Sequence, residues 1–177
     1  MTDTFLKDII KRFLVYKELG DKTLAVLNED ELYYRTAESN NSIAIIVKHM
    51  NGNMLSRWTN FLTEDGEKSW RQRDAEFEGL EKNKELVLKL WNEGWDCLMN
   101  TLQSLQSEDL TKTIYIRSEP LIVYDAILRQ LAHYPYHVGQ IVVIAKWLKK
   151  DDWHSLTISK GESQQYLQKM QQKFGKS

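Results

Sequence analysis

Residues 128–141 read LRQLAHYPYHVGQI, a largely apolar stretch of helical periodicity that contains two of the chain's four histidines. His133 and His137 are four residues apart, so at about 100° per residue they lie on one helical face, one turn apart. Two neutral imidazoles at this spacing can share one metal ion, as on the helix of the zinc proteases. No Glu follows His133, which excludes the protease motif itself. The other interpretation is a pair of hydrogen-bonded core histidines.

The composition predicts one all-helical domain over residues 1–177. Apolar residues make up 42% of the chain, enough for a sizeable core, and there are only two prolines and eight glycines. The formal net charge of −1 gives no basic field for nucleic acid. A single cysteine excludes an internal disulfide and favours a cytoplasmic location. No apolar run approaches the roughly 20 residues of a membrane span, and no signal peptide is evident.

Four segments show a 3.6-residue apolar period, and together they predict an antiparallel four-helix bundle. The expected helices cover residues 4–28, 42–62, 80–106 and 120–149, with a short C-terminal helix over 163–174. Ser42 is a good N-cap for the second helix, and Ser118 with Pro120 suits the start of the fourth. Pro135 removes one backbone hydrogen bond, so we expect a kink there.

A third histidine, His49, belongs to the second predicted helix. It lies about 140° from the main apolar stripe of that helix, beside Ile45 and Ile46. A histidine in this position is either exposed or turned towards a second buried surface, and both alternatives stay open.

Residues 63–77 are dense in charge and contain an Asp65-Gly66 turn signal. The simplest interpretation is a solvated loop. The alternative is a rim over a binding site, which the presence of Trp70 in so polar a stretch favours.

Several blocks of the chain, taken together, resemble one uncharacterised subfamily of the DinB/YfiT-like superfamily of metal-dependent helical proteins. The matching blocks are Asn41-Ser42-Ile43-Ala44, His49-Met50-Asn51-Gly52-Asn53, Arg57-Trp58-Thr59, Asp65-Gly66-Glu67-Lys68, Arg73-Asp74, Glu76-Phe77 and the histidine pair with Val138-Gly139-Gln140. The resemblance extends over about residues 3–165. Pro135, between the paired histidines, departs from the family pattern.

The resemblance implies a bundle in which His49, His133 and His137 hold one divalent metal, zinc or nickel most often. Family members of known activity are transferases and an isomerase that use bacillithiol, mycothiol or glutathione. We therefore expect a metal-dependent thiol S-transferase acting on small electrophiles in detoxification or stress, with a hydrolase as a further enzymatic option. The alternative is a non-catalytic metal-binding bundle with a structural or sensing role.

Four further residues carry predictions. Asn53 lies one turn beyond His49, and Gln140 lies one turn beyond His137. Both side-chain amides are candidates to hydrogen-bond the imidazoles. His154 falls outside the helical pattern and is expected at the surface, and Cys97 is expected to be a packed thiol. The six tryptophans and eight tyrosines exceed what one small core encloses, which predicts a homodimer.

Overall fold

The structure is a computed structural model that describes residues 2–175, and it is predominantly helical. The helices are α1 Thr2–Ala25, α2 Glu29–Tyr33, α3 Ile43–Trp58, α4 Lys84–Ser104, α5 Val123–Lys149 and α6 Ser163–Phe174, with short 3-10 turns η1 Asp74–Phe77, η2 Ser107–Thr111 and η3 Lys150–Asp152. The strands β1 Thr113–Ile116 and β2 Glu119–Ile122 form one antiparallel hairpin. The predicted all-α class is confirmed. Within residues 2–175, no helix is both long and apolar enough to cross a membrane.

The helix boundaries follow local capping signals where these exist. Ser42 caps α3, its hydroxyl accepting the Ile45 N–H at 3.3 Å, as the sequence predicted. The first helix ends at Ala25 rather than at residue 28. The Asn28 side chain instead accepts the Glu31 N–H and caps the short helix α2. The second helix stops at Trp58 rather than at residue 62, and Asn60 then takes a positive φ of 49°.

The predicted start of the last long helix is wrong. Ser118 and Pro120 were expected to begin it, but Pro120 lies in β2 and pairs with Tyr115 of β1. The helix begins only at Val123. A proline fits the hairpin because each strand of a two-stranded sheet has an outer edge that needs no N–H donor. The helix then runs unbroken through Pro135.

The turn of the hairpin is a two-residue loop in which both residues are left-handed, with φ of 56° at Arg117 and 63° at Ser118. Such type I′ turns favour Asn and Gly, and neither is present here. The Asp65 carboxylate compensates by accepting the N–H groups of Arg117 and Ser118, each at 2.8 Å. Asp65 also accepts the Glu67 N–H at 2.7 Å, so one side chain fixes both chain segments.

We expect Asp65→Ala to lower the free energy of unfolding by about 1.5–3 kcal/mol, the range for hydrogen bonds to a charged group. Burial raises the pKa of Asp65, but the three backbone donors outweigh burial and hold the pKa below its ordinary value of 3.8. The stabilisation is therefore present above pH 3.8 and is lost as the pH falls through the lower folded-state pKa. Urea unfolding at several pH values measures this, with exposed Asp8→Ala as the control. An equal loss of unfolding free energy in the two variants at neutral pH would contradict this role of the Asp65 carboxylate.

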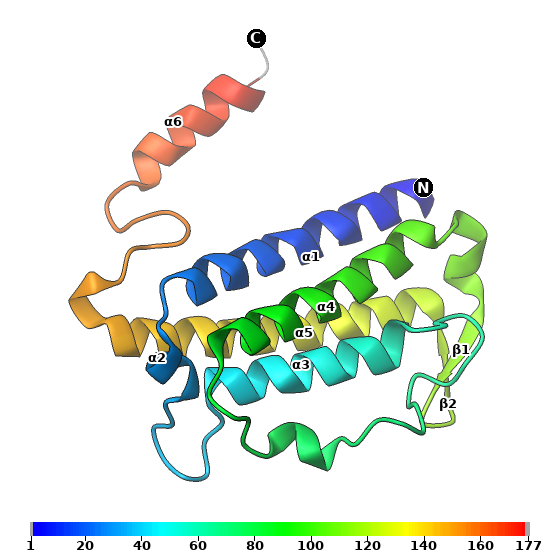
Figure 1. The fold of residues 1–177 in the computed structure, drawn as a ribbon. Coiled ribbons are helices and arrows are strands. Elements are labelled where there is room, and N and C mark those ends of the chain that lie inside the picture. The colour runs from blue at the N-terminus through cyan, green and yellow to red at the C-terminus, as the bar shows by residue number, and fades with distance from the viewer. Residues whose placement is uncertain (1, 176–177) are drawn as a thin grey trace.

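The four long helices α1, α3, α4 and α5 lie side by side (Figure 1). They do not simply alternate in direction, as the predicted antiparallel arrangement requires. Asn51, midway along α3, donates to the Leu90 carbonyl in the first third of α4 at 2.9 Å, and Thr101, late in α4, donates to the carbonyl of Trp58 at the end of α3 at 3.0 Å. Helices α3 and α4 are therefore parallel neighbours, and the long crossover 59–83 returns the chain between them.

Gly94 explains how these two helices approach so closely. A Cβ at this position would lie 3.1 Å from the Asn51 Cα and 3.0 Å from the Met54 sulfur. The absent side chain thus leaves room for the backbone of α3.

The core between the helices contains an aromatic cluster. Phe13, Trp95 and Tyr134 come from α1, α4 and α5, and their ring centroids lie 6.1–6.4 Å apart in tilted or edge-on contacts. The Trp58 indole donates to the Tyr134 hydroxyl at 2.9 Å, which in turn donates to Asn53 Oδ1 at 3.0 Å. The core therefore connects by hydrogen bonds to the polar face of α3.

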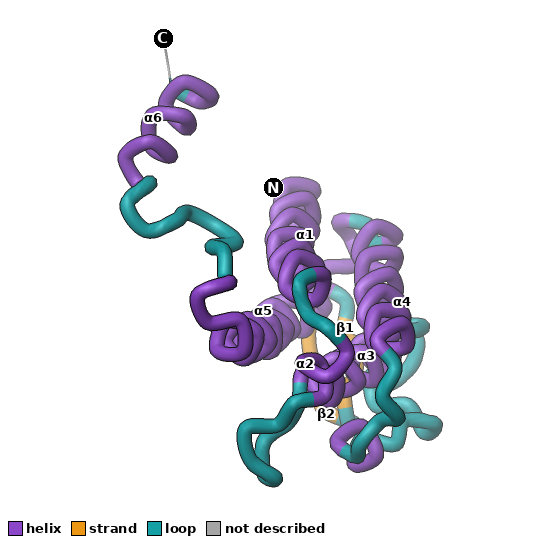
Figure 2. The backbone as a smooth tube through the Cα atoms, turned by 60° about the vertical axis from the view of Figure 1, so that its left-hand side comes forward, coloured by secondary structure: helices purple, strands orange, loops and turns teal. Residues whose placement is uncertain are grey.

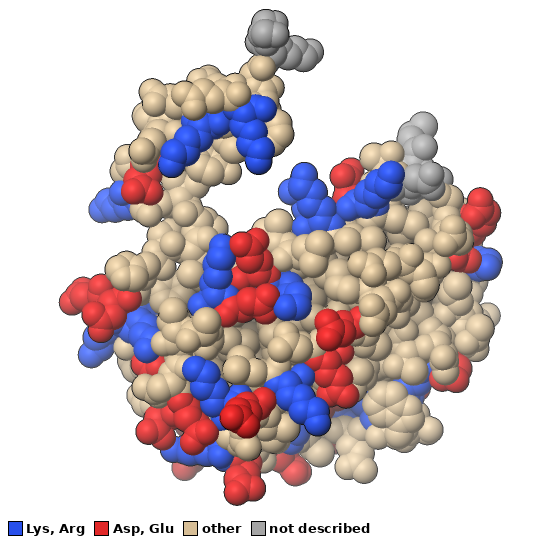
Figure 3. Space-filling view, turned by 45° about the horizontal axis from the view of Figure 1, so that its top comes forward, with Lys and Arg blue, Asp and Glu red and all other residues tan. Residues whose placement is uncertain are grey.

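Two segments lie outside this helix assembly. The crossover 59–83 runs back along α3 and places η1 against it (Figure 1). Helix α6 matches its predicted range but stands apart from the long helices and buries no residue (Figure 2). Acidic and basic side chains are interspersed over the face that Figure 3 shows.

Candidate metal centre

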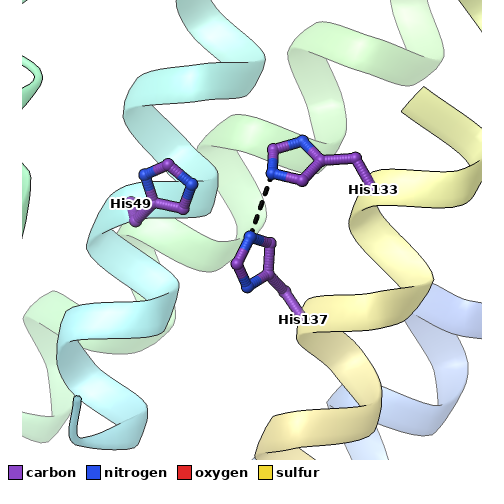
Figure 4. A group of neighbouring side chains, drawn as sticks. All are labelled: His49, His133 and His137. Carbon is purple, nitrogen blue, oxygen red and sulfur yellow. Dashed lines mark hydrogen bonds between the residues drawn. The ribbon is translucent and has the colours of Figure 1, made fainter. Parts of the chain in front are cut away.

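Three histidines from two helices converge on one point. His49 extends from α3, and His133 and His137 extend from successive turns of α5 (Figure 4). One ring nitrogen of each lies within 4.8 Å of those of the other two. The sequence left His49 either exposed or facing a second buried surface. The structure shows the second arrangement, with only 6% of His49 exposed.

The two α5 histidines have a geometry that suits a shared cation. Their Nε2 atoms are 3.0 Å apart, while His137 Nδ1 lies 2.8 Å from Gln140 Oε1 and His133 Nδ1 lies 3.2 Å from Gln130 Oε1. An amide oxygen only accepts, so each Nδ1 carries the proton and each Nε2 presents a lone pair. The contact between the two Nε2 atoms, dashed in Figure 4, is a hydrogen bond only if one of these nitrogens carries a proton. With both Nδ1 atoms protonated, two lone pairs face each other, and a cation between them would stabilise the arrangement.

The spacing also agrees with metal coordination. Imidazole nitrogens bind zinc at about 2.0–2.1 Å, so two ligands at angles of about 90–110° lie roughly 2.8–3.4 Å apart. The observed 3.0 Å between the two Nε2 atoms falls in this range. Burial is the largest cause that lowers the pKa of His133 to about 3, and the neighbouring titratable groups, His137 first, lower it further. Burial also lowers the pKa of His137. Both rings are thus neutral near pH 7, the form that binds metals.

His49 is oriented by a carboxylate that the sequence analysis missed. Its Nδ1 donates to Glu76 Oε2 at 2.8 Å, which leaves Nε2 to face the other two histidines. Arg71 holds the same carboxylate with two donors, Nε to Oε1 at 2.7 Å and a terminal nitrogen to Oε2 at 3.0 Å. Burial raises the pKa of Glu76, but His49 and Arg71 outweigh it and lower the pKa. A carboxylate behind a histidine is a common support for metal ligands.

The element that carries Glu76 is fastened to α3 next to His49. The Lys48 ammonium donates to the Ala75 carbonyl of η1, and the Phe77 ring lies 4.8 Å from the imidazole of His49. Part of the charged segment 63–77 is therefore a wall of the site, as the second of its two interpretations required. Trp70, which favoured that interpretation, is not part of the wall, since 55% of it is exposed.

Gly52 gives the Glu76 carboxylate its space. A Cβ at residue 52 would lie 2.4 Å from Glu76 Oε1 and 2.8 Å from its carboxyl carbon. We expect Gly52→Ala to displace the carboxylate from His49 and to weaken zinc binding about tenfold, within the range for loss of a supporting partner. A competition titration with a chromophoric chelator measures the affinity. Gly139→Ala is the matched control, because a Cβ there meets nothing within 4 Å. Equal affinities in the two variants would refute this role of Gly52.

The two amides predicted to support the histidines have different positions. Gln140 contacts His137 as predicted, and its orientation is fixed because its Nε2 donates to the Tyr136 hydroxyl at 3.1 Å. Asn53 contacts no histidine; its Oδ1 accepts from Tyr134 instead. The partner of His133 is Gln130, which the sequence analysis overlooked although i, i+3 spacing points to it.

The remaining candidates lie away from the centre. His154 is exposed, as predicted. Cys97 is half-buried in α4, 3.8 Å from the Thr59 hydroxyl, and burial raises the pKa of its thiol. A protonated, half-buried thiol is a weak nucleophile, in agreement with a packing role.

A pocket of about 290 Å³ opens beside the histidines. It is polar and rich in arginine, and its lining consists of His49, Asn53, Arg57, Arg71, Arg73, Arg117, Arg129, Gln130 and His133. Two of the three clustered histidines thus border a space large enough for a small molecule.

The fold and the site define a helical protein with a cluster of three histidines that could hold a metal ion. The chain belongs to the family described as "Protein of unknown function (DUF1572)", whose model matches residues 1–162. The match ends just before α6, so it contains all the histidines of the site. No curated protein matches the chain.

Proposed function

We propose that the four long helices form a DinB/YfiT-like bundle and that His49, His133 and His137 hold one divalent metal ion, zinc or nickel. The sequence blocks quoted above support the relationship, and the convergence of the three histidines supports the site. The observation that carries the proposal is the approach of the His133 and His137 Nε2 atoms to 3.0 Å, with His49 completing the group.

The number of ligands favours catalysis over a purely structural role. Among residues 4–175, no further His, Cys, Asp or Glu joins the three-histidine group. Structural zinc sites are usually closed by four protein ligands, whereas catalytic sites use three and keep a position open. The adjacent pocket lets a small molecule reach that position. A closed, non-catalytic metal site would require a fourth ligand in addition to the three histidines.

Each protein residue has a defined part in this proposal. The histidines would hold the ion, Glu76 and Arg71 would orient His49, and Gln130 and Gln140 would fix the tautomers of the α5 pair. When bound, such an ion supplies Lewis-acid chemistry that lowers the pKa of a thiol or water within its reach. The pocket would hold the second reactant beside it.

The reaction we propose is thiol S-transfer to a small electrophile, in a cytoplasmic protein concerned with detoxification or stress. The thiol sulfur forms a bond to the electrophilic carbon. With a haloalkyl substrate the halide departs with its bonding electrons and the thiol proton passes to solvent; with an epoxide or an enone the electron pair stays on the product, which takes up a proton. This choice rests on the DinB/YfiT-like resemblance. A hydrolase using the same centre is the alternative.

A thiol-consumption screen tests the reaction. Zinc-loaded and nickel-loaded protein is incubated with a low-molecular-weight thiol and a panel of haloalkyl, epoxide and enone electrophiles, and free thiol is followed with time. We expect consumption that requires the loaded metal and disappears in His133→Ala. Hydrolysis of the same electrophiles without loss of thiol would assign the hydrolase instead, and rates equal to those of His133→Ala throughout would oppose an enzymatic role.

A homodimer is also part of the proposal. Tyr136, Val143 and Trp147 lie along one face of α5 and are 62%, 67% and 54% exposed. An aromatic-rich exposed stripe of this kind is typical of interfaces. We expect sedimentation to show a dimer that Val143→Lys converts to a monomer, whereas Val15→Lys, at an exposed valine of α1, leaves it intact. A monomeric wild-type protein over a wide concentration range would contradict this prediction.

A further inference from the structure

The pocket beside the histidines has an unusual charge. Five arginines line it, and no Asp or Glu is among its lining residues. They come from four parts of the chain: Arg57 from α3, Arg71 and Arg73 from the crossover 59–83, Arg117 from the hairpin turn and Arg129 from α5. Segments distant in sequence thus bring like charges to one space.

The carboxylates that pair with these arginines lie behind the pocket and are shared. Glu67 Oε2 lies 3.1 Å from Arg57, 3.6 Å from Arg71 and 2.8 Å from Arg117. One negative charge therefore serves three guanidinium groups.

The other arginines also have partners. Glu76 is divided between Arg71 and His49, Arg129 pairs with Glu119 at 3.2 Å, and Arg73 lies 4.0 Å from Asp74. Five arginines therefore share four carboxylates, which leaves a surplus of positive charge to which a divalent ion on the histidines would add.

One buried donor in this group has no acceptor. The Arg71 side chain is only 1% exposed, and its terminal nitrogen Nη1 makes no hydrogen bond; the nearest carboxylate oxygen, on Glu67, is 3.6 Å away. A buried donor without a partner costs free energy, more so when it is charged. The structural requirement for Arg71, holding Glu76, is already met by Nε and the other terminal nitrogen. Because Arg71 also lines the pocket, a small shift of its side chain would bring this unsatisfied nitrogen to an anion bound there.

The arginines and the histidines occupy different positions along α3 and α5. On α3, His49, Asn53 and Arg57 occupy successive turns of one face, about 12 Å from first to last at 1.5 Å per residue. On α5, Arg129 precedes His133 by one turn. The arginines therefore lie on the hairpin side of the histidines on both helices, as the directions of α3 and α5 in Figure 1 show.

We propose that this pocket binds the anionic end of the substrate, a carboxylate or phosphate group, with the reacting end of the molecule directed towards the histidines. The oxyanion would accept hydrogen bonds from Arg71, Arg117 and Arg129, because the planar guanidinium fork suits both groups. This inference rests on the proposed function, since it names the substrate class of the same site: small anionic electrophiles.

Binding of two simple probes tests the assignment. Calorimetric titration of metal-free and zinc-loaded protein at low ionic strength uses inorganic phosphate and succinate, with succinamide as the uncharged analogue. We expect phosphate or succinate to bind at millimolar concentration or below, succinamide not to bind, and added salt to weaken the binding. Tighter binding of phosphate identifies a phosphate-bearing substrate, and tighter binding of succinate a carboxylate-bearing one.

Variants locate the binding. The double change Arg117→Gln with Arg129→Gln should weaken it at least tenfold; both side chains are about half exposed, so folding should tolerate the change. Arg12→Gln, at an exposed arginine of α1, should leave it unaltered. Anion binding without any zinc binding would support this inference and refute the metal centre. Zinc binding with no anion binding, or with equal binding in the double variant, would refute this inference alone.

Discussion

Replacing His133 with alanine is expected to abolish tight zinc binding, lowering the affinity by more than 100-fold. Loss of an outer partner already costs about 10- to 100-fold, and His133 would be a direct ligand. Its Nε2 lies 3.0 Å from that of His137, and the residue borders the pocket. Among the described residues, no further His, Cys, Asp or Glu belongs to the group and could replace it. His49→Ala and His137→Ala should have the same effect. Elemental analysis gives the stoichiometry, and chelator competition gives the affinity.

The control for these variants is His154→Ala, because His154 is exposed and is not a member of the cluster. It should bind zinc as the wild-type protein does. Circular dichroism should show that all four metal-free variants keep their helices, since the aromatic core does not depend on the histidines. If His49→Ala retained full stoichiometry and affinity, the three-histidine centre would be wrong.

Glu76→Gln is expected to keep the zinc stoichiometry but weaken the affinity by about 10- to 100-fold. The substitution preserves the shape of the side chain and removes the charge that His49 Nδ1 and Arg71 share. It leaves the buried Arg71 without its closest carboxylate, so a lower melting temperature should accompany the loss of affinity.

The matched control is Glu78→Gln, two residues further on and exposed. It removes the same charge from the same segment without touching a histidine. Equal zinc affinities for the two variants would show that the charge of the segment, rather than the contact with His49, is what matters.

The parts of this site that the sequence predicted are the local ones. The i, i+4 spacing of His133 and His137 and the cap at Ser42 depend only on residues within one helical turn. The inclusion of His49 came from the family resemblance, since helix geometry alone left it either exposed or buried. The same kind of spacing predicts the contact of Gln140 with His137, and it also indicates the contact of Gln130 with His133.

The parts that escaped prediction depend on contacts between distant segments. Glu76 reaches His49 across 27 residues, and only the path of the crossover 59–83 brings it there. The hairpin turn escapes prediction because Ser118 and Pro120 are good local signals for the start of a helix. Asp65, more than 50 residues away, holds that turn in its left-handed form. The parallel pairing of α3 and α4 likewise follows from a connection long enough to permit either direction.

Diffraction from zinc-loaded crystals on both sides of the zinc absorption edge is the most direct test of the three-histidine centre. We expect one anomalous peak, about 2.0–2.1 Å from Nε2 of His49, His133 and His137. The Nδ1 atoms of these rings should remain with Glu76, Gln130 and Gln140. A peak coordinated by other residues, or three histidines without a peak at saturating zinc, would contradict the three-histidine centre.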